Sequence, residues 1–315
     1  MTHVDTQAIW LGHPGHLVAL PDPSPGVETF RTQHVAVHVG VSGGRIVDVT
    51  GSGLRTFRYS YSRLTEDEAN LIDQFHSGAH GCGPWALIDP VYPNRFDASQ
   101  SSGGSACGGA RGFAVAEPDR VEVDTRCAHH GRASILWSFN PQTMRHLAMP
   151  SRWPALPGRE GVRAFPIIPN APVNLAAYVR PEAVTWVGWS PRFFDACGDE
   201  LESPQAAPVA AAPGCWQPVL AQRIIPPADA AWIAPRLSAV TVAPRVCDPA
   251  RVRVDTLSMT YGRSTSTSGS RLEVPRPGAG VPQVEISNWT QTIPHLGHID
   301  GELELVEVCG EVETQ

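Results

Sequence analysis

Metal-binding residue types gather just after the first strongly helical segment of the sequence. His76 and His80 are four residues apart, which is the spacing of two ligands on one helical face, and Cys82 follows them. Gly78 lies between the histidines and is expected to end the helix, so the two need not share a face. Matching ligand types without a complete set are common. We therefore favour ordinary side chains over a metal site here.

A second set of oxygen ligands flanks a glycine turn. Asp195 and Asp199 bracket Gly198, and carboxylate oxygens are the ligands that Ca²⁺ prefers. The alternative is an ordinary turn, in which Asp and Gly serve the backbone conformation. We favour the turn, keep calcium as the alternative, and expect no other cofactor.

Three tryptophans are candidates for stacking on sugar rings. Trp186 and Trp189 are three apart in a strand-like run, so they should point to opposite faces, one into the core and one outward. Trp216 follows a glycine at the start of another strand. Because large aromatic side chains are mostly buried, packing is favoured for each and sugar binding is the alternative.

Catalytic and nucleic-acid-binding patterns are missing from the sequence. It contains no G-x-S-x-G, H-E-x-x-H or P-loop motif, so we expect no enzyme. The net charge is −7 and no basic block is present, although all 24 basic residues are arginine, which argues against nucleic acid as a partner. The seven cysteines form no C-x-x-C pair, and no apolar run is long enough to span a membrane.

The periodicity of apolar residues predicts a mainly β protein with one helix. Residues 35–41 and 45–49 alternate around a Ser-Gly-Gly turn, which predicts a hairpin, and 54–62 alternates again. A helix is expected over about 65–77, because Thr65 and Glu68 form a capping box. Further alternating runs lie at 173–179, 284–286 and 302–308, and 216–225 and 251–260 are expected to be strands as well.

Two stretches rich in Gly, Ser and Pro divide the chain. They cover 99–112 and 263–282 and have the composition of linkers. The block between them has the size of a domain, and the short C-terminal piece could not bury a sheet face alone. We therefore predict one discontinuous β-sandwich domain, 1–105 plus 275–315, interrupted by an inserted β domain at 113–262.

The outer segments resemble one family of phage proteins. An aromatic strand (FRYSYSRL), the capped helix (TEDEANLIDQFHSG), GPWALIDP and YPNRFDASQSS follow one another, and VPQVEISNWTQTIPHLGHIDGELELVEV ends the chain. This order resembles the distal tail (Dit-like) and actinophage-type minor tail proteins of siphophages. The inserted block, with AAYVRP, VGWSPRFFDACGDEL and GCWQPV, resembles carbohydrate-binding-module-like jelly rolls.

The resemblance implies a structural virion protein at the distal end of the phage tail, assembled in the host cytoplasm. It implies a homo-oligomeric, hexameric ring that contacts the tail tube protein on one side and the tail hub, tail-associated protein or fibres on the other. The inserted jelly roll would either attach to host cell-wall glycan or dock neighbouring tail proteins. The alternatives are a free-standing carbohydrate-binding adhesin and, ranked last, a glycan hydrolase, which would need two placed carboxylates.

Overall fold

The computed structural model describes residues 4–26, 28–31, 34–39, 45–50, 54–105, 109–241, 249–262, 278–295 and 297–308. Two short α-helices, one 3₁₀ turn and many antiparallel strands make up these residues, which confirms the prediction of a mainly β fold. The chain divides into two compact units. The host unit is Ala8–His13, Val18–Leu87 and Pro282–Gln315, and the insert unit is Met1–Gln7, Pro14–Leu17 and Ile88–Val281.

A seven-stranded sheet forms the host unit. In spatial order its strands are β2 (His16–Ala19), β1 (Trp10–His13), β7 (Trp85–Ile88), β21 (Gln283–His295), β22 (His298–Glu307), β6 (Arg55–Leu64) and β3 (Glu28–Arg31). The alternation predicted for 54–62 is confirmed, because Phe57, Tyr59 and Tyr61 are buried and the residues between them are more exposed. β21 pairs with β7, and β22 pairs with β6. The C-terminal strands therefore complete a sheet that N-terminal strands begin.

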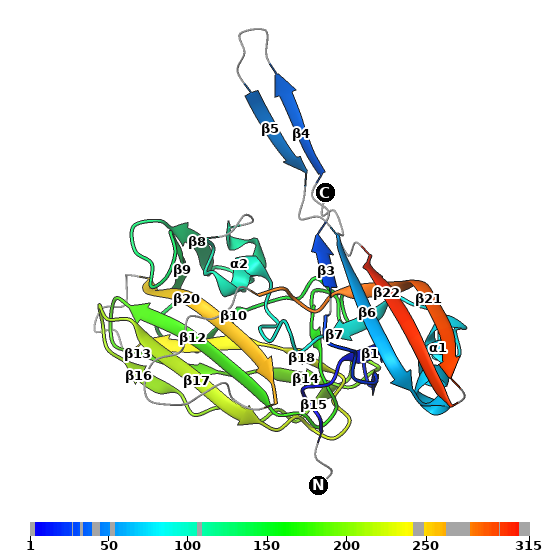
Figure 1. Ribbon diagram of the computed structural model, residues 1–315. Coiled ribbons are helices and arrows are strands. Elements are labelled where there is room, and N and C mark those ends of the chain that lie inside the picture. The colour runs from blue at the N-terminus through cyan, green and yellow to red at the C-terminus, as the bar shows by residue number, and fades with distance from the viewer. Residues whose placement is uncertain are drawn as a thin grey trace. The chain divides into compact units, whose positions relative to one another are not determined.

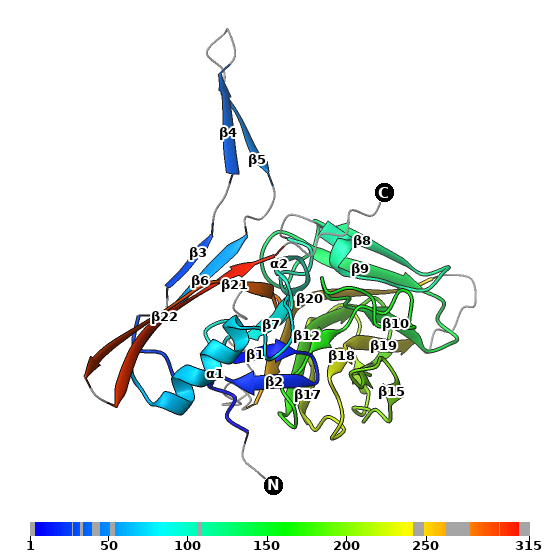
Figure 2. The same ribbon diagram turned by 90° about the vertical axis from the view of Figure 1, so that its right-hand side faces the viewer.

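Helix α1 (Glu66–His76) packs on this sheet, against β6, β21 and β22 (Figure 2). The capping box is confirmed: Thr65 Oγ1 accepts the backbone N–H of Glu68, and Glu68 accepts the N–H of Thr65. Ala69, Ile72 and Phe75 are its buried residues, which is the apolar face expected from the sequence.

The predicted hairpin is also present. β4 (His34–Val39) and β5 (Arg45–Thr50) pair antiparallel, from His34 opposite Thr50 to Val39 opposite Arg45. Val41 and the Ser-Gly-Gly turn lie outside the described residues.

The insert unit is a β-sandwich (Figure 1). One sheet has five strands in the order β17 (Gln217–Ile224), β12 (Val173–Pro181), β20 (Ala250–Tyr261), β9 (Ser134–Phe139) and β8 (Arg120–Asp124). A four-stranded sheet runs β10 (Arg145–Ala148), β19 (Arg236–Thr241), β13 (Thr185–Trp189) and β16 (Val209–Ala211). A second runs β11 (Phe165–Pro166), β18 (Trp232–Ala234), β14 (Arg192–Phe194) and β15 (Glu200–Leu201).

The core of the insert unit lies between these sheets. Trp137, Trp189, Phe139 and Phe193 are among its fully buried side chains. The Trp189 indole N–H donates to the backbone oxygen of Val219 at 3.0 Å, so β13 of a four-stranded sheet is tied to β17 of the five-stranded one. Such a partner is what a buried indole N–H requires.

The segment 99–112 differs from the linker that its composition indicated. Its described part contains most of α2 (Ala98–Ser101) and a 3₁₀ turn, η1 (Gly109–Gly112). Gln100 is fully buried and its amide donates to the backbone oxygens of Gly112 and Pro150. Asp97 caps α2 in a second capping box with Gln100, so specific hydrogen bonds override a flexible composition. Residues 263–277 of the second expected linker lie outside the described residues. No helix among the described residues is long and apolar enough to cross a membrane.

Candidate functional site

The outward face of the five-stranded sheet carries rows of polar side chains. Strand register places Arg120 of β8 opposite Ser138 of β9, and Ser138 opposite Arg251 of β20. The next such row is Glu122, Leu136, Arg253 and Arg180. The alternate residues of these strands, such as Trp137 and Val252, are fully buried. Because side chains alternate along a strand, one face of the sheet is core and the other is polar.

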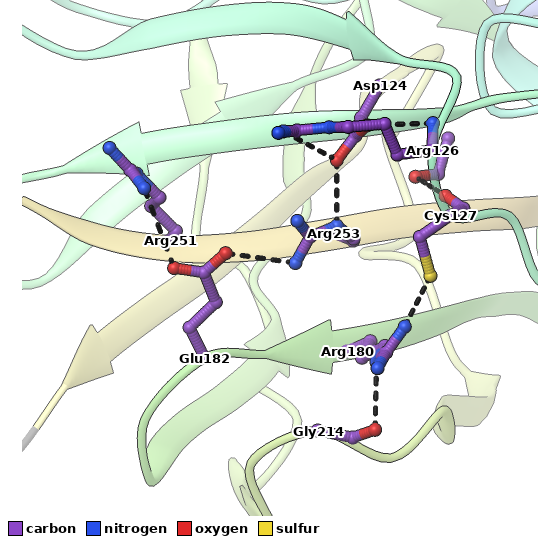
Figure 3. Close-up of polar contacts among 9 residues, drawn as sticks. Asp124, Arg126, Cys127, Arg180, Glu182, Gly214, Arg251 and Arg253 are labelled. Carbon is purple, nitrogen blue, oxygen red and sulfur yellow. Dashed lines mark hydrogen bonds and ion pairs between the residues drawn. The ribbon is translucent and has the colours of Figure 1, made fainter.

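A charged cluster occupies the middle of this face (Figure 3). The Asp124 carboxylate accepts hydrogen bonds from Nε of Arg126 and Nε of Arg253, each at 2.9 Å. Glu182 accepts from Arg253 at 3.0 Å and lies 3.8 Å from Arg251. The hydrogen bond from Arg126 holds the pKa of Asp124 well below its usual range, although burial opposes this effect. The cluster therefore fixes donors and acceptors of both signs in place.

An aromatic group lies beside this cluster. The loop between β8 and β9 brings the His129 ring onto Tyr178 of β12, with centroids 3.7 Å apart, and Trp216 meets His129 edge-on. Arg180 extends along the same face (Figure 3), where it donates to the backbone oxygen of Gly214 and to Sγ of Cys127. This loop covers Tyr178, and β12 is buried on both faces along most of its length, which its alternating sequence did not indicate.

A buried carboxylate anchors that loop. Asp255 Oδ2 accepts the backbone N–H groups of His129 and His130, at 2.8 and 2.9 Å, while Oδ1 accepts the N–H of Thr256. Burial raises the pKa of Asp255, and the three backbone donors act against that rise. The loop conformation thus depends on hydrogen bonds to one buried carboxyl group.

A groove of about 680 Å³ opens at the β8–β9 end of the face. Its lining is Pro118, Asp119, Arg120, Glu122, Arg126, Leu136, Ser138, Phe139, Asn140, Pro141, Gln142, Pro249 and Arg251. Among the charged lining residues Asp119 is buried, with a side chain 1% exposed and 3.6 Å from Nε of Arg145. Neither Asp119 oxygen has a hydrogen-bond partner within the described part of the chain. Burial raises the pKa of this carboxyl, which Arg145 partly opposes.

The three tryptophans singled out from the sequence do not lie together. Trp186 is 43% exposed and Trp189 is 1% exposed, so the prediction that they point to opposite faces is confirmed. Trp186 lies opposite Val240 and Ala210 on the outer face of a four-stranded sheet. Trp216 is half-buried beside His129, on the polar face of the five-stranded sheet.

The candidate calcium ligands form a turn. Asp195 Oδ1 accepts the backbone N–H groups of Cys197 and Asp199, and the Asp195 N–H donates to the Asp199 oxygen. These are the hydrogen bonds of an Asp-centred turn. Within the described residues no group of three or more His, Cys, Asp or Glu side chains is arranged to hold a metal ion. His80, one of the histidines considered above, stacks on Phe75.

Sequence reasoning missed the charged cluster and the groove. Their residues are single polar side chains separated by long intervals, such as Arg120, Ser138 and Arg251, and no local motif links them. Only the strand register brings them together. The one sequence signal is the placement of charges at alternate positions in RVRVD (251–255) and RVEVD (120–124), which marks a solvent-facing strand side.

No protein-family model matches the chain, and no curated protein matches it in sequence. Among solved structures, the CBM22-1 xylan-binding domain of Paenibacillus barcinonensis Xyn10C matches with a TM-score of 0.39 and 12% identity, over 52% of this chain and 94% of that one. The C-terminal family 22 carbohydrate-binding module of Clostridium thermocellum Xyn10B matches with a TM-score of 0.38 and 15% identity, over 56% and 99%.

A phage protein is also similar at this level. The enzymatically active domain of tailspike protein 4 from bacteriophage CBA120 matches with a TM-score of 0.37 and 12% identity, over 55% of this chain and 22% of that one. About half of the present chain is therefore similar in outline to family 22 modules. A likeness this distant carries no conclusion about a ligand or an activity.

Proposed function

We propose that this chain is a non-enzymatic structural protein of a phage tail tip, in which the host unit forms a ring at the end of the tail tube and the insert unit attaches to host glycan. The observation that carries the proposal is the discontinuous host sheet. β6 and β7 near the start of the chain are completed by β21 and β22 near its end, and a whole sandwich is inserted between them.

Four of the motifs behind the family resemblance occupy elements of the host unit. FRYSYSRL lies in β6, TEDEANLIDQFHSG contains α1, GPWALIDP contains β7 and ELELVEV overlaps β22. A further motif, YPNRFDASQSS, lies in the insert unit. This arrangement supports the Dit-like assignment as a proposal.

Ring closure would use the edges of the host sheet. β2 and β3 are its two edge strands, and unpaired edges readily pair with another chain. A head-to-tail contact between edges generates a closed ring when the rotation closes. The proposed partners are further copies of this chain, the tail tube protein, and the tail hub or fibre proteins, with the virion tail as the location.

The mass of the purified full-length protein tests ring formation. Light scattering behind a sizing column should give a discrete closed oligomer, and a hexamer would have six times the 33.8 kDa chain mass. Repeating the measurement with added tail tube protein would detect a ring that assembles only on the tube. A monomer in both experiments would contradict the ring.

A free-standing carbohydrate-binding adhesin is the second candidate. The polar outer face and groove of the insert unit favour it, because neither needs the host unit to be complete. It predicts a monomer with measurable affinity for glycans.

A further inference from the structure

We propose that the groove at the β8–β9 end of the five-stranded sheet binds a neutral, polyhydroxylated saccharide segment, and that the tryptophans do not. This inference rests on the glycan-attachment part of the proposed function and names the place and the ligand chemistry. It does not depend on the ring.

The size and rim of the groove suit a small ligand. Its volume of about 680 Å³ lies within the range of about 300–1,000 Å³ that is usual for ligand sites. Three prolines, Pro118, Pro141 and Pro249, contribute to the lining. Because the proline ring fixes the backbone φ angle, these parts of the rim lose little conformational freedom when a ligand binds.

The exposed lining offers both donors and acceptors. Arg120, Asn140, Gln142 and Arg251 are exposed, and Ser138 lies half-buried at the centre of the row between Arg120 and Arg251. Guanidinium and amide N–H groups donate, whereas amide oxygens and the serine hydroxyl accept. A sugar hydroxyl both donates and accepts, so a ligand with many hydroxyls can satisfy this mixed set.

Charge balance favours a neutral ligand over an anionic one. Arg126 is paired with Asp124, Arg251 lies near Glu182, and Asp119 lies near Arg145. Arg120 and Glu122 add one charge of each sign. Paired arginines retain N–H groups for hydrogen bonding but present little net positive field to a distant anion.

Trp186 and Trp216 are poorer candidates for binding a saccharide than the groove is. Neither residue lines the groove. Trp186 lies in a cross-strand row with Val240 and Ala210, whose side chains offer a sugar no hydrogen-bond partner. Trp216 is half-buried and already contacts His129.

The test uses the full-length protein on an array of neutral hexose and N-acetylhexosamine oligosaccharides beside uronic-acid oligosaccharides. The neutral glycan that binds best is then titrated calorimetrically at low and high salt. We expect neutral glycans to be retained and their Kd to change less than twofold with salt, because no counterions are released.

Three variants locate the site. Ser138→Tyr fills the floor of the groove with a residue that strands accept readily, and it should weaken binding at least tenfold. Arg120→Ala should weaken binding severalfold. The matched control is Arg111→Ala, which removes an exposed arginine of the insert unit outside the groove lining and should leave the Kd unchanged. Thermal unfolding verifies that each variant is folded.

The remaining outcomes overturn the inference in distinguishable ways. Binding that survives Ser138→Tyr and Arg120→Ala but is lost in Trp186→Ala or Trp216→Ala would place the site elsewhere and leave glycan attachment intact. Binding only to uronic acids, weakened strongly by salt, would refute a neutral ligand. No binding to any glycan would refute both the groove and glycan attachment, while ring assembly is judged separately by mass.

Discussion

The two outer faces of the inserted sandwich differ in kind. The five-stranded sheet presents paired charges, a groove and an aromatic group. The four-stranded sheet that contains β13 presents Trp186, Val240 and Ala210 in one cross-strand row. In the next row Pro208 lies against Gly188 and leaves no room for a side chain there. The exposed Trp186 therefore lies outside this groove.

This difference shows what makes a hollow on a sheet. Side chains project from a sheet face, but the strands alone supply no walls at its ends. The groove is lined by segments outside the strands, 118–119, 140–142 and 249, together with the row Arg120–Ser138–Arg251. Loops thus create the site, and the sheet fixes its floor.

The largest expected loss of stability distinguishes the core residue Trp189 from the exposed residue Trp186. Trp189→Ala removes a fully buried indole and its hydrogen bond to Val219, and should lower the free energy of unfolding by about 3–5 kcal/mol. Urea unfolding followed by circular dichroism measures the loss. A loss no greater than that of Trp186→Ala would contradict the division of the two faces into core and surface.

A smaller loss of stability is expected when Asp255, which anchors the loop between β8 and β9, is replaced. Asp255→Ala leaves the N–H groups of His129, His130 and Thr256 without their acceptor, which should cost about 3 kcal/mol. Hydrogen exchange at His129 and His130 should speed up with it. Asp255→Asn, which keeps one acceptor oxygen, is the control and should fall between the variant and the native protein. Unchanged exchange in Asp255→Ala would refute the anchor.

The charged cluster should contribute less, and in a pH-dependent way. Asp124→Asn should cost about 1–2 kcal/mol at pH 7, because the carboxylate is 2% exposed but its partner Arg126 is largely exposed and screened by solvent. The pKa of Asp124 is lower in the folded chain than in the unfolded chain. Its stabilisation is therefore complete above the unfolded pKa of about 4 and is lost as the pH falls through the folded pKa.

Unfolding curves of the native protein and Asp124→Asn between pH 7 and pH 2 check this prediction. The difference in unfolding free energy should shrink as the solution becomes more acidic than about pH 4. A difference that stays constant over this range would show that Asp124 acts through packing and not through its charge.

The sequence was sufficient where the signal is local. The capping box of Thr65 and Glu68, the alternation of Phe57, Tyr59 and Tyr61, and the turn around Gly198 each depend on neighbours within a few residues, and each is present. α2 carried a similar signal, since Asp97 and Gln100 have capping-box spacing. The Gly- and Ser-rich composition around it indicated a linker instead.

The groove could not be predicted because its parts are distant in the chain. Arg120, Ser138 and Arg251 become neighbours only through the register of β8, β9 and β20. A shift of one residue in either pairing would turn these side chains into the core. Register depends on the packing of the whole sandwich, which no single segment encodes.

The smallest expected change in stability concerns Trp186, on the outer face of the four-stranded sheet that contains β13. Trp186→Ala should change the free energy of unfolding by less than about 1 kcal/mol, because the side chain is 43% exposed. Urea unfolding measures it beside Trp189→Ala, and glycan titration should give the native Kd. A large loss of stability would show that something else in the protein covers Trp186 in solution.

The pairing of β6 with β22 has a consequence for the order of folding during synthesis. Arg58 and Glu304 are bonded across these strands although 246 positions separate them. The ribosome therefore releases every strand of the inserted sandwich before β22 exists. We expect the sandwich to fold first on the nascent chain, while β6 waits with an unpaired edge. A chain truncated before residue 283 should then resist protease in strands β8 to β20 of the sandwich and be cut within β6.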